Sequence, residues 1–148
     1  MWQSVIAILG TLAGASVTAW FQQRGQRAER AAATLAAHRR DALDAVTDLV
    51  TALADHRTTM WLREDARLAG ADWTTLRADS HTTRAAITAP AVRVAILLPA
   101  LADTAQAATA ATYAMRNATD HAALAAARED AVTAADRLID AAGQHLAA

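Results

Sequence analysis

The chain has 148 residues, 44 of them alanine and only one each phenylalanine and tyrosine, which favours helices with thin cores and excludes a sandwich or barrel rich in β-branched and aromatic runs. Its net charge of -1 gives no global attraction to nucleic acid, so direct nucleic-acid binding is not expected. The lack of cysteine excludes disulfides, thiolate nucleophiles and thiolate metal sites. We therefore expect an all-α protein.

The first element in chain order is an uncharged stretch from Trp2 to Phe21. A helix of about twenty residues rises about 30 Å, the hydrocarbon thickness of a bilayer. Aromatic residues at both ends of the stretch suit the headgroup region. We expect residues 1–22 to form a transmembrane anchor helix. One alternative is a cleaved signal peptide with residues 17–19 as the cleavage site, although the usual positively charged start is missing. The other is a buried soluble helix, which needs more apolar partner surface than the later segments offer.

Basic residues lie only on the carboxy-terminal side of this stretch. No arginine precedes it, whereas Arg24, Arg27 and Arg30 follow closely. Because the arginine-rich side of a span usually stays in the cytoplasm, we expect a single-pass protein of the cell membrane, with its amino terminus outside and residues 23–148 cytoplasmic. The three arginines are also placed to attract anionic lipid headgroups.

Small residues recur along the same stretch at spacings of three and four. Ala7, Gly10, Gly14 and Thr18 would give the helix a smooth side, which lets helices approach closely in lipid. This pattern indicates a homo-oligomer formed within the membrane. The alternative is that small residues are simply common in spanning helices.

The pattern of residues 23–148 predicts helices. Residues 22–68 contain no proline and form one long amphipathic helix, which Gly70 ends, with Asp72 as a cap for the next helix. That second helix should kink or break at Pro90, and again at Pro99. Residues 92–98 between the prolines could form a strand, but helix is favoured because no partner strand exists.

Two further helical segments complete the domain, one ending near Arg116 and one closing the chain. Asn117 and Thr119 mark either a turn or a capped restart between them. Short connections favour antiparallel neighbours. We therefore expect an antiparallel three-helix bundle with long helices, following the membrane anchor.

Residue patterns that support catalysis are missing. The five histidines are far apart in sequence and lack metal-ligand spacing, so no catalytic, cofactor-binding or metal-binding residue is expected, and the chain should not be an enzyme.

The densest mixture of aromatic and charged groups lies in one segment near the first turn. Its members form a candidate partner surface: Trp61, Arg63, Glu64, Asp65 and Arg67. The alternative, which we favour, is that Trp61 packs against Trp73 across the turn while the charges pair with helical neighbours.

Three segments carry a resemblance to a known family: the opening MWQSVIAILGTLAGASVTAWFQQR, the segment MWLREDARLAG, and ITAPAVRVAILLPALAD with its two prolines. With these segments the chain resembles, over nearly its whole length, small actinomycete proteins of the KilB type, named for plasmid spread functions. The resemblance implies a membrane-associated accessory protein that helps conjugative plasmid DNA move between hyphal compartments and harms the host when unregulated. It carries over no catalytic residue.

Residues and resemblance together predict a membrane-anchored interaction protein that forms homo-oligomers and binds other plasmid-transfer proteins. The alternative is a membrane-perturbing toxic or stress factor with a holin-like effect, whose span assembles into a lesion. A soluble enzyme is a third possibility, with no residue pattern in its favour.

Overall fold

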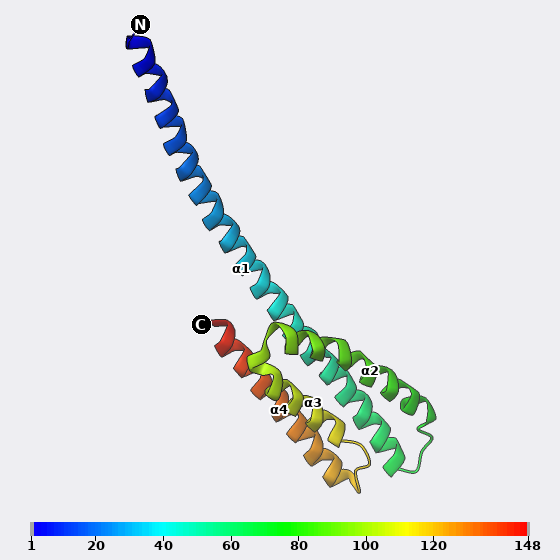
Figure 1. Ribbon diagram of the computed structural model, residues 1–148. Helices are drawn as coiled ribbons and strands as arrows, with labels where there is room; N and C mark the ends of the chain where they lie inside the picture. Colours follow the sequence, from blue (N-terminus) through cyan, green and yellow to red (C-terminus); the bar gives the residue numbers. More distant parts are fainter. Residues whose placement is uncertain (1, 148) are drawn as a thin grey trace. The chain divides into compact units, whose positions relative to one another are not determined.

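The computed structural model describes the backbone of Trp2–Ala147 and the side chains of residue 27 and residues 29–147. In chain order the elements are α1 (Trp2–Leu68), α2 (Thr74–Leu97), the short 3₁₀ helix η1 (Pro99–Leu101), α3 (Ala102–Ala114) and α4 (His121–Ala147) (Figure 1). The described backbone holds no strand, which confirms the all-α prediction and the helical choice for the residues before Pro99. The chain divides into two compact units, residues 1–39 and 40–148.

The second unit is a bundle of four helical segments that run alternately up and down: the end of α1 from residue 40, then α2, α3 and α4 (Figure 1). The prediction of three helices was wrong by one. The chain reverses at Leu98, whose φ of -134° and ψ of 65° leave the helical region, and Pro99 then opens η1. Proline suits the first turn of a helix because its missing N–H would have no partner there.

Helix α2 runs through Pro90 without interruption, so the short break expected there as the alternative to a kink does not occur. Proline removes one backbone hydrogen bond and strains the preceding turn. Ile87 and Val94, on either side of it, are buried at 1% and 0% exposure. Burying each large apolar side chain stabilises the fold by about 1.5 to 3 kcal/mol, enough to hold both halves of α2 on the core despite the lost bond.

Local chemistry sets the helix ends. After α1, Gly70 has φ +70°, and the N–H of Ala71 donates to the carbonyl of Ala66 while that of Gly70 donates to Arg67, a Schellman motif. Asp72 Oδ1 then accepts the Thr74 N–H at 2.9 Å. These two contacts confirm the predicted stop and cap.

The connection between α3 and α4 contains both of the alternatives considered for it. Asn117 takes a positive φ of 62°, which makes a turn. Asp120 Oδ1 accepts the Ala123 N–H at 2.7 Å and so caps α4. The capping side chain is therefore Asp120 and not Thr119.

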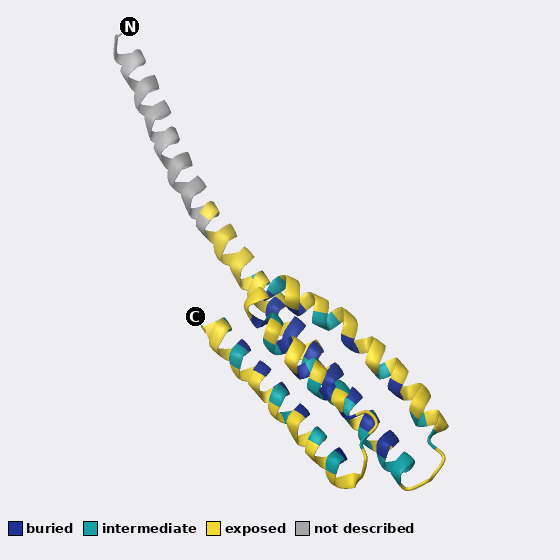
Figure 2. Ribbon diagram, turned by 60° about the horizontal axis from the view of Figure 1, so that its bottom comes forward, coloured by how far each residue is buried: buried dark blue, intermediate teal, exposed yellow. Residues whose placement is uncertain are grey.

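The core is built from a few large apolar side chains and many alanines, which lie on the inward sides of the helices (Figure 2). Leu49, Leu53 and Leu138 are fully buried. Ala45, Ala108 and Ala131 are also fully buried, which lets helix backbones approach closely. A second cluster toward the α1–α2 turn contains Met60, Met115, Leu124 and Ala131.

Among the described side chains of α1, the first buried one is that of Ala42. Residues 27 and 29–41 are exposed, except for the half-buried Ala37. Across the described part of the chain, no helix combines the length and apolarity needed to cross a bilayer. The predicted anchor, residues 1–22, lies outside the residues whose side chains are described.

Candidate functional site

The predicted partner segment lies on α1 where it packs against α2 and α4, and two of its five residues are buried. Arg63 is 6% exposed and Glu64 is 0% exposed, so neither belongs to an open surface. Asp65 and Arg67 are half-buried. Glu64 pairs with Arg67 and Arg63 on the same helix, as favoured from the sequence, whereas Asp65 Oδ1 lies 3.2 Å from His121 Nε2 on α4.

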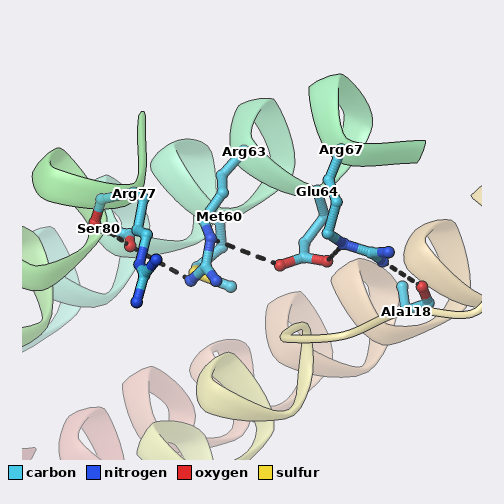
Figure 3. A network of polar contacts seen from close by, with 7 residues as sticks. All are labelled: Met60, Arg63, Glu64, Arg67, Arg77, Ser80 and Ala118. Carbon is cyan, nitrogen blue, oxygen red and sulfur yellow. Dashed lines mark hydrogen bonds and ion pairs between the residues drawn. The ribbon is translucent and has the colours of Figure 1, made fainter. Parts of the chain in front are cut away.

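A polar network joins these charges (Figure 3). Arg67 Nε donates to Glu64 Oε2 at 2.7 Å, and an NH2 hydrogen of Arg67 is donated to the carbonyl oxygen of Ala118. The other Glu64 oxygen lies 3.7 Å from Arg63 Nε, too far for a hydrogen bond. Arg63 NH1 donates to Ser80 Oγ at 3.3 Å on α2. One buried carboxylate thus lies between two arginines, and one of these, Arg67, ties α1 to the α3–α4 connection.

Aromatic rings near the network lie under guanidinium groups. Arg128 is 5.4 Å from the centre of the Trp61 ring, and Arg63 is 5.2 Å from that of Trp73. The predicted packing of Trp61 against Trp73 is therefore replaced by separate contacts with arginines. Cation–π contacts of this kind contribute about 0.5 to 2 kcal/mol. They are favoured here because the region holds many arginines and few large apolar side chains.

His56 is buried between α1, α2 and α3. Its Nδ1 lies 2.8 Å from Thr83 Oγ1, and its ring meets Tyr113 edge-on at 5.5 Å between centres. Thr83 Oγ1 also lies 3.2 Å from the carbonyl oxygen of Asp79, to which it can donate its single proton. Burial, followed by the positive charges of Arg84 and Arg63, lowers the pKa of His56 to about 4. The imidazole is neutral at physiological pH.

Beside His56 the bundle surface is hollowed by about 20 Å³, room for about one water molecule. We call this the arginine hollow. Its lining comes from three helices and consists of His56, Met60, Arg63, Ser80, His81, Arg84, Tyr113 and Arg116. Arg84 and Arg116 are exposed at its edge, and the Arg84 guanidinium lies 4.1 Å from the centre of the Tyr113 ring.

Sequence reasoning identified Arg63 in this group and missed the rest. A signal was present, because Ser80 and Thr83 stand in the same helical stripe as Leu76 and Ile87. Two hydroxyls on a core-facing stripe indicate a polar group opposite them. Arg84 and Arg116 carried no such signal, since only folding brings them beside Arg63.

A second, apolar hollow of about 370 Å³ lies between α1 and α4. Its lining includes Leu43 and Ile139, which are 55% and 46% exposed, together with Val46, Val50 and Leu146. Continuous exposed apolar surface of this kind is typical of interaction sites.

The predicted membrane sites fall mostly outside the described side chains. This holds for Ala7, Gly10, Gly14 and Thr18 and for Arg24. Arg27 and Arg30 are described, and both are exposed on α1.

Comparison with known proteins gives a consistent family assignment. The family model described as the KilB plasmid transfer protein matches residues 43–146, which is most of the bundle. The chain is 45% identical to Protein KilB of Streptomyces lividans, over 98% of this chain and 98% of that protein. No solved structure matches it. The resemblance found in the sequence is confirmed, and the chain belongs to the KilB plasmid transfer protein family.

Proposed function

We propose that this protein is a membrane-anchored accessory protein of conjugative plasmid transfer, which holds a helical bundle at the cytoplasmic surface to bind other transfer proteins. The observation that carries the process is the family match, since identity of 45% extends over 98% of both chains. The match therefore extends well beyond the bundle, over nearly all of both chains. The exposed apolar hollow between α1 and α4 supports a binding role for the bundle.

The membrane part of the proposal rests on the uncharged residues 2–21. Placing arginine at the centre of a span costs about 2.5 to 3.5 kcal/mol for each residue. We expect the variant Ile8→Arg with Leu12→Arg to move from the membrane pellet to the high-speed supernatant. It should also fail to restore transfer of a plasmid that lacks the gene. The matched control, Ile8→Val with Leu12→Ile, should stay in the pellet and restore transfer.

Two results would contradict this anchoring. One is recovery of the unaltered chain in the supernatant without detergent. The other is restoration of transfer at the normal frequency by the arginine variant.

The orientation in the membrane can be tested separately, because the chain has no cysteine and single cysteines can be introduced. A membrane-impermeant maleimide should label Gln3→Cys in intact cells and Ala147→Cys only after lysis. The reverse pattern would refute the proposed orientation.

The proposed oligomer forms through Ala7, Gly10, Gly14 and Thr18. Replacing Gly10 and Gly14 with leucine should lower crosslinking between copies, because larger side chains separate the helices. This variant also separates the two functions considered. A membrane-perturbing factor should lose its toxicity, whereas an adaptor should keep much of its partner binding. Leucine at Ala15 and Ala19 is the control, and should change neither property.

A further inference from the structure

The arginine hollow gathers positive charge that the protein itself neutralises only in part. Arg63, Arg84 and Arg116 line it, and no carboxylate is among its lining residues in the described part of the chain. Glu64 is the nearby buried acid, and it is already hydrogen-bonded to Arg67. Like charges in a partly desolvated place repel one another, so an anion between them would be stabilised.

Arg63 supplies the buried wall of the hollow and lacks charged hydrogen-bond acceptors of good geometry. Its NH1 donates to the neutral atoms Ser80 Oγ at 3.3 Å and Met60 Sδ at 3.7 Å. Its Nε lies 3.7 Å from Glu64 Oε1, beyond hydrogen-bond distance, and has no hydrogen-bond partner. A guanidinium offers five N–H donors, and leaving them unbonded in a buried place costs free energy. Arg63 at 6% exposure is therefore a buried cation with unused binding capacity.

The edge of the hollow is also positive, and it is held in place. Arg84 is fixed over the Tyr113 ring at 4.1 Å. Arg116 reaches the same place from the end of α3 and is exposed to solvent. Burial is the main cause that lowers the pKa of His56, and the positive charges of Arg84 and Arg63 lower it further. His56 also contacts Thr83 on α2 and Tyr113 on α3, neither of which supplies a carboxylate.

The size of the hollow limits what it can hold. A space of about 20 Å³ admits an oxygen atom or two, and not a sugar or a base. We propose that the arginine hollow is a binding site for a phosphate group, with an oxygen inserted toward Arg63 and the others bonded by Arg84 and Arg116. Phosphate fits because arginine binds its oxygens in pairs through charge-assisted hydrogen bonds. The group can come from free phosphate or from the headgroup of an anionic lipid.

The first test is calorimetric titration of the full chain, in mild detergent, with inorganic phosphate at constant ionic strength set by sodium chloride. We expect saturable binding of one phosphate for each chain. Arg84→Gln and Arg116→Gln should each weaken the affinity on the order of tenfold, since a charge-assisted hydrogen bond is lost. Both side chains are exposed, so both variants should fold. The matched control is Arg137→Gln, an exposed arginine of α4 outside the hollow, which should keep the affinity.

The second test locates the phosphate by NMR of the histidine rings at pH 7.5. The signals of His56 and His81, which line the hollow, should shift on adding phosphate, while those of His38 and His145 should not. The proposal is overturned if phosphate binding is absent, if all four rings respond alike, or if Arg137→Gln weakens binding as much as Arg84→Gln.

The third test separates the two sources of phosphate. A short-chain phosphatidic acid is compared with inorganic phosphate, and short-chain phosphatidylcholine serves as the uncharged control. Tighter binding of phosphatidic acid by tenfold or more, lost in Arg84→Gln, supports a lipid headgroup in the site. Equal affinities support free phosphate. Binding of phosphatidylcholine as tight as that of phosphatidic acid would contradict the site, because its phosphate is shielded by choline.

Discussion

Neutralising Glu64 should be among the most damaging single changes in the bundle. In Glu64→Gln the side chain keeps its shape, but Arg63 at 6% exposure loses the only buried negative charge beside it. The hydrogen bond of 2.7 Å from Arg67 also becomes a bond to a neutral oxygen. Removing one partner of a buried pair costs about 3 to 5 kcal/mol. We expect the low end of this range, about 3 kcal/mol, because Arg67 is partly exposed and can turn to solvent.

The assay is urea unfolding of the full chain, followed by circular dichroism at 222 nm. With a slope of about 1 to 3 kcal/mol per molar urea, the midpoint should fall by about 1 to 3 M. Glu129→Gln, at an exposed position of α4, is the control and should change stability by less than about 0.5 kcal/mol. Adding Arg63→Met to Glu64→Gln should recover much of the loss, because the unpaired buried charge is then gone. Equal midpoints for Glu64→Gln and Glu129→Gln would refute this reasoning.

Three further predictions can be checked in the same assay. Gly70→Ala should destabilise the bundle by about 1 kcal/mol, because alanine disfavours φ +70°. Gly143→Ala, in the regular part of α4 with open space around it, should stabilise the bundle by up to about 1 kcal/mol. Changes of the same sign in the two variants would contradict the role of Gly70. Leu53→Ala should lower the free energy of unfolding by about 2 to 5 kcal/mol, since Leu53 is fully buried. A loss below about 1 kcal/mol would show that the core readily collapses into the cavity left by the leucine side chain. Acid should weaken the fold through His56. Its pKa is lowered from 6.5 to about 4 on folding, so the unfolded chain binds the proton first, and stability that is complete above pH 6.5 is lost as the pH falls toward 4, by about 3 kcal/mol in total. His56→Gln should flatten this part of the pH profile, and an unchanged profile would exclude His56 as the cause.

Several features could be predicted from residues close in sequence, without knowledge of the tertiary structure. Gly70 and Asp72 end one helix and start the next because each satisfies backbone groups within a few residues, and both are found as predicted. The all-helical class followed from the alanine content and from the lack of paired strands. The family could also be identified from contiguous segments of the sequence. None of these features needs residues distant in sequence to meet.

The expectations that failed depended on packing. A short break of α2 at Pro90 was one of the two outcomes expected, but burial of Ile87 and Val94 outweighs the missing hydrogen bond. Trp61 and Trp73 were expected to pack together, but Arg128 of α4 lies over the Trp61 ring and Arg63 of α1 over the Trp73 ring. In each case a rule based on neighbouring residues predicted a preference worth a few kcal/mol. Contacts made in the folded bundle stabilised the observed arrangement by as much or more.

The sequence by itself determined that the chain is helical, where α1 ends and which family it belongs to, because these follow from neighbouring residues. Only the tertiary structure decided that Arg63 and Glu64 are buried and that Arg84 and Arg116 face the same hollow. The physical reason is that a helix periodicity tells which residues share a side, but not which side of another helix they will meet. Which charged residues come together in a site made from three helices is decided only when those helices pack.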